Sequence, residues 1–451
     1  MLSKNFKITF FLSLLVFTLS LYANLSNFID DPELLALFPP FIKGVDVTYN
    51  THLGGEYYFM AQSIADGKGF SNPFNESTGP TAWMPPVYPL LLALLITLFK
   101  SKLIVATIIL FAKNIVLIFT GITIYNIAKK TSKRLKPEWI LFIYLIFLIS
   151  FFRWFFQITH DIWLILFFIN LIFIFGIRIW EKRLTLRASI LWGLIGGGAV
   201  CTSPVVGFTW GLLTIFSFYL FMKNNTPLKK FLIISTVICL LINSTWTIRN
   251  YIIFKSFIPV KSNLFYDAYK SNFVKENGMP DESFLLNFHP IWSHHPEHIT
   301  DKNESKNHAA WNSQKVEFDS YKLLGEKKYL ENYEKKFKQR LAEQPQLFLK
   351  KVFKRLLAIT LVYYPYNLEY ESKFLIWKSI VHAFPFCFLL LALLFQGKRS
   401  VQFGCAVFIY ISFLTPYLLV SYYIRYSIPL VPLLALFVFW GVDMILNRNR
   451  K

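Results

Sequence analysis

The fold is decided by an apolar run and by the basic cluster that follows it. Residues 103–127 read LIVATIILFAKNIVLIFTGITIYNI, residues 129–136 read KKTSKRLK, and residues 139–152 read WILFIYLIFLISFF. A helix needs about 20 apolar residues to cross a bilayer, and loops on the cytoplasmic side carry an excess of Lys and Arg. The stretch therefore predicts two membrane-spanning helices joined by a cytoplasmic loop.

The composition of the whole chain agrees with this local signal. The 451 residues are 55% hydrophobic and 16% charged, with a mean hydropathy of +0.44. Soluble domains carry about 25% charged residues, so the composition excludes an ordinary soluble enzyme, a disordered chain and a coiled coil. The net charge is +21. The basic residues lie between apolar runs, so membrane topology explains this charge better than nucleic-acid binding does.

Ten apolar runs are predicted to span the membrane. The first, residues 8–23, reads either as a cleaved signal peptide or as a retained helix, and the membrane character of the rest favours retention. The others are 103–127, 139–152, 162–177, 188–201, 205–222, 231–246, 374–395, 401–419 and 427–446. Two shorter runs, 86–99 and 353–364, would give twelve spans. The ten-span alternative keeps most Lys and Arg on the inner side and places both termini in the cytoplasm.

Two long segments then face outward, 24–102 and 249–373. In the second, apolar residues recur every four positions from Tyr329 to Leu341, which predicts a helix that Pro345 interrupts. The basic and apolar residues around Phe353 and Arg355 predict a second helix that lies on the membrane surface. We therefore expect an all-α polytopic protein in three parts: 1–248 with seven spans, 249–373 outside the membrane, and 374–451 with three spans.

Two acids at outward helix ends are the candidate catalytic residues. Glu56 follows Gly54-Gly55, and Asp161 follows His160 where the fourth span begins. Acids from separate loops beside the membrane suit a general base or a ligand for a divalent cation. The alternatives are a solvated loop acid or a helix cap, with Asp30, Asp31 and Asp46 as weaker candidates for the role of Glu56.

Basic residues on the outer side point to phosphate. Arg249 follows the seventh span, Lys261 lies beyond it, and Arg425 precedes the tenth. These residues break the inner-side bias, and a guanidinium binds phosphate well through its forked donors; the alternative is a side chain that snorkels at a helix end.

Other motifs have structural explanations. The histidines of residues 289–298 are interrupted by Pro296 and read as surface residues, and the three glycines at 196–198 indicate close helix packing. The four cysteines, all in apolar runs, read as buried and inert. The sequence contains no Walker A, GxGxxG or GxSxG motif.

At these residues the chain resembles the polytopic glycosyltransferases of the GT-C fold that use polyprenyl-phosphate sugars, such as protein O-mannosyltransferases, the aminoarabinose transferase of lipid A and bacterial family 39 relatives. The matching stretches are EYYFMA at 56–61, ADGKGFSNPF at 65–74, TGPTAWMPPVYP at 78–89, WTIRN at 246–250 and VKSN at 260–263, with GEKKY at 325–329 and Arg425-Tyr426. Asp267 and Asn272 fit a bacterial subgroup. The sequence departs from the family where Leu53 and Gly54 stand in place of an Asp-Glu pair.

The resemblance implies a transferase in the bacterial inner membrane with an extracytoplasmic site. Its donor would be a polyprenyl-phosphate sugar, and its acceptor a lipid, a glycan or a protein. Glu56 and Asp161 would be catalytic, and the substrate or its phosphate would contact Tyr57, Arg153, His160, Arg249, Asn250, Lys261, Asp267 and Arg425. Some relatives use a divalent cation; the two acids do not require one, so no metal ligand is assigned. The rival functions are a transporter or flippase for a lipid or anionic solute, and a non-catalytic assembly protein.

Overall fold

The computed structural model describes residues 4–30, 55–74, 77–151, 155–156, 160–182, 185–221, 226–274, 304–363, 375–395 and 400–448. These residues form helices and connecting loops, and in them the only β pairing is an isolated bridge between Ser71 and Pro80. The prediction of an all-α protein is confirmed. Arg153, the histidines of 289–298 and the acids Asp31 and Asp46 lie outside the described residues, as does the side chain of Asp30.

The described residues contain helices along the whole length of the chain. In chain order they are α1 (Lys4–Asp30), α3 (Gly55–Ala65), α4 (Val87–Phe99), α5 (Lys102–Thr131), α6 (Trp139–Ser150), α7 (Ile162–Trp180), α8 (Leu186–Thr202), α9 (Pro204–Phe221), α10 (Thr226–Phe254), α11 (Leu264–Tyr269), the π-helix η2 (Lys270–Val274), α13 (Glu304–Glu343), α14 (Pro345–Thr360), α16 (Leu375–Phe395), α17 (Val401–Leu419), the 3₁₀ helix η6 (Ile424–Leu430) and α18 (Val431–Arg448).

Seven helices of the described residues are long and apolar enough to cross a membrane. They lie in α1, α5, α7, α10, α16, α17 and the segment Arg425–Asn447, and all seven fall on predicted spans. The other three predicted spans form the shorter apolar helices α6, α8 and α9. The chain is therefore a multi-pass membrane protein by the length and composition of its helices, while the count of ten remains a prediction.

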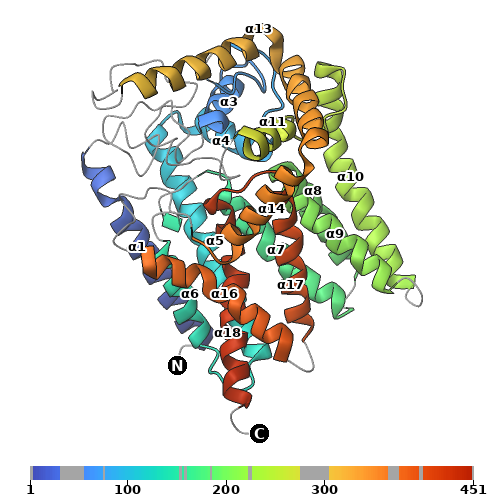
Figure 1. Cartoon of the computed structure of the whole chain (residues 1–451). Coiled ribbons are helices and arrows are strands. Elements are labelled where there is room, and N and C mark those ends of the chain that lie inside the picture. The colour runs from blue at the N-terminus through green and yellow to red at the C-terminus, as the bar shows by residue number, and fades with distance from the viewer. Residues whose placement is uncertain are drawn as a thin grey trace.

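The long helices form a bundle, and α13 lies across one end of it. Figure 1 shows α13 passing over α3, α4 and α11 at the top, with α5, α7, α17 and α18 running below. Helix α17 packs on α7 and α9, and α18 packs on α5, α6 and α16. The C-terminal helices therefore share one apolar core with the N-terminal ones.

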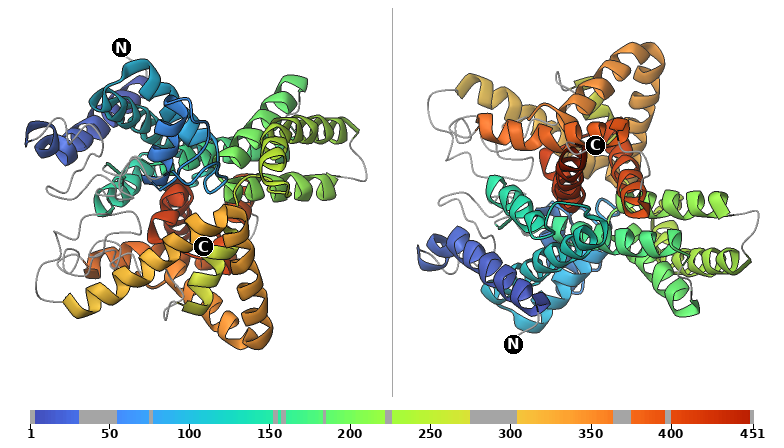
Figure 2. Two further views of the ribbon diagram at one scale, coloured as in Figure 1. Left: turned by 90° about the horizontal axis from the view of Figure 1, so that it is seen from above. Right: turned by 90° about the horizontal axis from the view of Figure 1, so that it is seen from below.

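Helices α8, α9 and α10 form an arm at the side of the bundle (Figure 2). Glycines allow their close approach, as predicted. A Cβ added at Gly197 would lie 2.6 Å from a side-chain atom of Ile242 on α10, and one at Gly196 would lie 2.4 Å from the Trp210 ring on α9. Of the four cysteines, Cys201, Cys239 and Cys405 are buried as expected, but Cys387 is exposed on the outer face of α16.

Helix α14 begins at Pro345, directly after α13 ends at Glu343, as the sequence predicts. A helix on the membrane surface would leave its basic residues in water, but Arg355 is fully buried. The Arg355 guanidinium donates to the carbonyl of Leu418 at 2.7 Å and to Oδ1 of Asn272 at 2.7 Å. The end of α17 offers carbonyls that lack helical partners, which attract a cation. Leu349 and Phe353 are exposed on the other face.

The last helix holds a loop from the first third of the chain. The Asp443 carboxylate on α18 accepts hydrogen bonds from the backbone N–H groups of Lys133, Arg134 and Leu135 at 3.0, 2.8 and 2.7 Å. These residues connect α5 to α6 and belong to the predicted cytoplasmic cluster. A buried carboxylate with three N–H donors is well satisfied, so the loop is fixed to the end of the bundle.

Candidate functional site

Glu56 lies in the first turn of α3 and is nearly enclosed. Glu56 is only 7% exposed, and its Oε2 has no hydrogen-bond partner within the described residues. Burial raises the pKa of Glu56 from 4.5 to about 7; the nearby positive charges of Arg425 and Lys261 lower it, and the charge of Asp267 raises it. A buried carboxyl group with a free oxygen and a pKa near neutrality has the properties of a general base.

The Asp161 side chain contacts two partners, Tyr57 and His160. Tyr57 directly follows Glu56 in the chain. The Tyr57 hydroxyl donates to Oδ2 of Asp161 at 2.8 Å, and Nδ1 of His160 lies 3.1 Å from Oδ1. Asp161 directly precedes α7 but makes no side-chain capping bond, so the alternative of a simple helix cap does not describe it. Its carboxylate instead joins α3 to the start of α7.

Burial shapes the protonation of the two partners of Asp161. It lowers the pKa of His160, and the charges of Arg425 and Lys113 lower it further, while the hydrogen bond to Asp161 raises it. Burial and the neighbouring charges of Asp161 and Glu56 raise the pKa of Tyr57 well above its ordinary value. Tyr57 therefore remains a hydrogen-bond donor at neutral pH, and His160 favours the neutral imidazole.

Positive charge reaches the acids from two further elements. Arg425 stands on η6, between α17 and α18, with its guanidinium 4.6 Å from the ring centroid of Tyr423. Lys261 lies in the loop before α11, with Nζ 3.7 Å from Oδ2 of Asp267. Both cations act on Glu56. The structure thus brings together seven predicted site residues from four separate parts of the chain: Glu56, Tyr57, His160, Asp161, Lys261, Asp267 and Arg425, which we call the acid–base cluster.

Arg249 and Asn250 lie near the end of α10, where both side chains bond to backbone carbonyls of nearby loops. The Arg249 guanidinium donates to the backbone carbonyls of Thr81 at 2.7 Å and Phe70 at 2.9 Å, and it lies 4.9 Å from the Trp246 ring centroid. The Asn250 amide donates to the carbonyl of Ile258 at 2.9 Å. Through these contacts the two side chains hold the neighbouring loops against the end of α10. They support a structural role and do not support the predicted phosphate contact, because the forked donors of Arg249 are already engaged.

Lys113 is a member of the site that sequence reasoning missed. It lies within α5, inside a candidate membrane span, and is 3% exposed. Its positive charge acts on His160, which places it beside the acid–base cluster. Ionisable residues inside a span are costly and usually functional. A lysine inside a run of 25 apolar residues was the available signal, since residues 103–127 contain no other charged residue.

Metal ligands do not gather in the described part of the chain. It contains no group of three or more His, Cys, Asp or Glu side chains placed to hold a metal ion. The histidines of residues 289–298, which the sequence pattern indicates are surface residues, lie outside that part.

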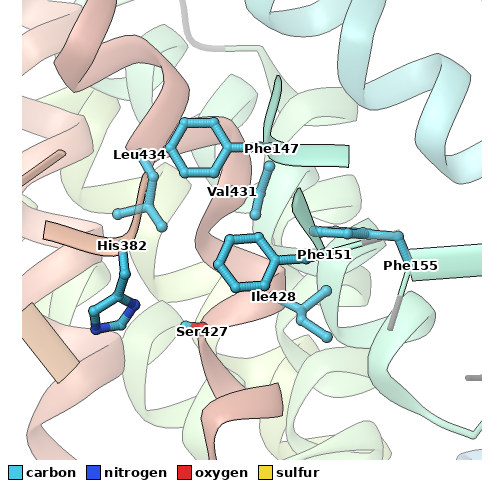
Figure 3. Close-up of a pocket in the computed structure, with 8 residues that line it drawn as sticks. All are labelled: Phe147, Phe151, Phe155, His382, Ser427, Ile428, Val431 and Leu434. Carbon is cyan, nitrogen blue, oxygen red and sulfur yellow. The ribbon is translucent and has the colours of Figure 1, made fainter. Parts of the chain in front are cut away.

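A small cavity lies between η6, α16, α18 and the end of α6. It is lined by Phe147, Phe151, Phe155, His382, Ser427, Ile428, Val431 and Leu434 (Figure 3). Nε2 of His382 contacts the carbonyl of Ala358 at 2.8 Å, and the rest of the lining is mostly apolar. With a volume of about 20 Å³ it has room for little more than a water molecule, so the acid–base cluster remains the stronger candidate site.

No family model, curated protein or solved structure matches this chain. The function is therefore argued from the residues of the acid–base cluster.

Proposed function

We propose that the protein is a membrane glycosyltransferase that moves a sugar from a polyprenyl-phosphate donor to an acceptor on the extracytoplasmic face of a bacterial inner membrane. The observation that carries the proposal is the acid–base cluster itself: Glu56 is buried, its Oε2 lacks a hydrogen-bond partner within the described residues, its pKa is about 7, and the charges of Arg425 and Lys261 act on it. A base and a cationic patch side by side are what transfer from a phosphate leaving group requires.

The reaction assigns a task to each group. The acceptor oxygen bonds to the anomeric carbon, the bond from that carbon to the phosphate oxygen breaks, and the acceptor proton passes to Oε2 of Glu56. The polyprenyl phosphate that leaves carries one more negative charge than it did in the donor. Arg425 and Lys261 offset that charge, as preorganised donors do where charge develops.

Asp161 serves the acceptor side in this proposal. Its two oxygens already accept from Tyr57 and contact His160, so it is less free than Glu56 to take a proton. Asp161 orients the Tyr57 hydroxyl, and together with His160 it offers hydrogen bonds to a hydroxyl group of the acceptor. A GT-C arrangement of the spans and a seven-span catalytic module, 1–248, belong to the same proposal.

A lipid or anionic-solute transporter is the second candidate function. Lys113, buried within a span, favours it, because charged residues inside the membrane also mark transport paths. The two functions differ in their product: a transferase releases polyprenyl phosphate, whereas a transporter moves its lipid unchanged.

The decisive experiment uses the purified protein in nanodiscs with polyprenyl-phosphate sugars. We expect release of polyprenyl phosphate, detected by mass spectrometry, that Glu56→Gln abolishes and Asp66→Asn, an exposed acid at the end of the same helix segment, does not. A membrane lipid extract from a deletion strain should accumulate the uncleaved donor and so identify its sugar. Movement of labelled lipid across vesicles without cleavage would replace the transferase with the transporter.

A further inference from the structure

A second buried carboxylate, Glu326, lies outside the acid–base cluster and joins three segments of the outer region. It is 5% exposed. Oε1 accepts from the backbone N–H of Ala82 at 2.8 Å and from the Ser262 hydroxyl at 2.7 Å, while Oε2 accepts from the hydroxyls of Tyr321, at 2.9 Å, and Thr81. Four donors satisfy both oxygens of the carboxylate, which makes this a rigid junction.

The backbone of α13 is bent so that Glu326 can reach this junction. Gly325, the preceding residue, has φ 74° and ψ 158°, a conformation that is essentially restricted to glycine. The first half of α13 supplies Tyr321, and the bend turns Glu326 toward the loops that contain Thr81 and Ser262.

The loop that holds Lys261 is fixed on both sides. On one side, the carbonyl of Val260 accepts from the indole N–H of Trp246 at 3.0 Å. On the other, the backbone N–H of Ser262 donates to the carbonyl of Ala82 at 2.9 Å, and the Ser262 hydroxyl binds Glu326. The main chain at Lys261 is therefore fixed, and its ammonium group lies 3.7 Å from Oδ2 of Asp267 in the acid–base cluster.

We propose that Glu326 is a positioning residue for the candidate site, and that it acts by fixing the main chain beside Lys261. Through Ser262 and Ala82 the carboxylate ties the Lys261 loop to α13 and to the loop after α3, so that the ammonium group stays beside Asp267 of the acid–base cluster. The role of Lys261 in catalysis rests on the proposed transferase function, but the coupling between Glu326 and the electrostatics of Glu56 does not.

The coupling is measurable because Lys261 is one of the charges that act on Glu56. The groups that face Glu56 are Arg425 from η6, Asp267 from α11, Lys261 from the intervening loop, and Asp161 with its partner His160, reached through Tyr57. The charge of Lys261 lowers the pKa of Glu56. If Lys261 moves away, Glu56 must titrate at a higher pH.

The test follows the protonation of Glu56 by difference infrared spectroscopy in nanodiscs, with the carboxylic acid band assigned by its loss in Glu56→Gln. We expect Lys261→Met to shift the titration to higher pH. Glu326→Ala should give the same shift, and the double variant should show no further shift. Glu326→Gln should rescue the wild-type titration, since an amide oxygen still accepts from Ala82 and Ser262, and the two hydroxyls can reverse and accept from its NH₂ group.

Two controls separate positioning from general damage. Lys327→Met removes a half-exposed neighbour that pairs with Glu331 at 3.9 Å, and Tyr321→Phe removes one hydrogen bond to Glu326 on the side away from Lys261. Neither should move the Glu56 titration. An unchanged titration in folded Glu326→Ala, or an additive shift in the double variant, would overturn the proposal.

Glu326→Ala leaves four buried donors without their acceptor, so it is also expected to lower stability. If it does not fold, Ser262→Ala decides the matter: a small shift in the direction of Lys261→Met supports the proposal, and no shift refutes it. The measurement needs no turnover. A wild-type protein without transferase activity would therefore refute the proposed function and leave this inference standing.

Discussion

The pH dependence of sugar transfer provides the sharpest test of Glu56 as the base. The change to make is the pH of the assay, between 5 and 8.5, in the wild-type protein and in Glu56→Gln. Burial raises the pKa of Glu56 from 4.5 to about 7, and only the ionised carboxylate can accept a proton. Transfer should therefore rise as the pH increases through 7 and level off above 8.

The size of the effect follows from the degree of ionisation. A group with a pKa of about 7 is half ionised at pH 7 and about 1% ionised at pH 5, so the rate should fall about fiftyfold between these values. A glutamate with the ordinary pKa of 4.5 would be about three-quarters ionised at pH 5, and the rate would fall by less than about twofold. The upward shift corresponds to about 3 kcal/mol against ionisation.

The assay is the initial rate of polyprenyl phosphate release in nanodiscs with donor and acceptor well below saturation, so that the pH profile reports the ionisation of the free protein. The phosphodiester of the donor does not titrate in this range, so the profile reports on the protein or on the acceptor. Asp66→Asn is the matched control, because Asp66 is exposed and pairs with its neighbour Lys68, at 3.4 Å. It should reproduce the wild-type profile.

A rate that stays flat from pH 5 to 7, or a Glu56→Gln variant with wild-type activity, would refute the role of Glu56.

Three further predictions concern other parts of the chain. Arg249→Ala should lower the stability by roughly 1.5–3 kcal/mol, seen as a lower melting temperature in detergent, with no change in apparent donor affinity; a selective loss of donor affinity would restore its phosphate role. Lys113→Met should raise the pKa of His160, because the charge of Lys113 lowers it, and an unshifted histidine signal in a pH titration by NMR would separate the two residues. A reporter active only outside the cytoplasm should work when fused after residue 315 and fail after residue 133, and activity at both would contradict the ten-span topology.

The all-α fold and much of the candidate site could be predicted from the sequence. The thickness of the bilayer fixes the length of an apolar span, and the excess of Lys and Arg marks the cytoplasmic loops. Each span can therefore be predicted from its own stretch of sequence. Glu56 and Asp161 were identifiable because acids at outward helix ends are unusual. Glu56 and Asp161 lie near Lys261 and Arg425, two of the predicted phosphate ligands, because the outer ends of the helices converge.

The rest depended on orientation, which a one-dimensional pattern does not contain. Arg249 and Arg425 look alike in sequence, each at the end of a span, yet Arg249 bonds to two loop carbonyls. Arg355 belongs to an amphipathic pattern whose polar face was expected in water, but the ends of α17 and Asn272 provide acceptors that make burial favourable. Lys113 was concealed by the apolar residues around it, and only the packing of α5 beside His160 gives it a role.

The contact between Asp443 and the α5–α6 loop has a consequence for how the chain is made. More than 300 residues separate the two partners, so a ribosome has delivered nearly the whole protein before the carboxylate exists. Until then, the N–H groups of Lys133, Arg134 and Leu135 lack the acceptor that Asp443 provides. Insertion of α18 closes the bundle at this end, and a chain that stops before Val431 leaves the loop open. Quality-control proteases that recognise exposed loops could thus distinguish finished copies from truncated ones.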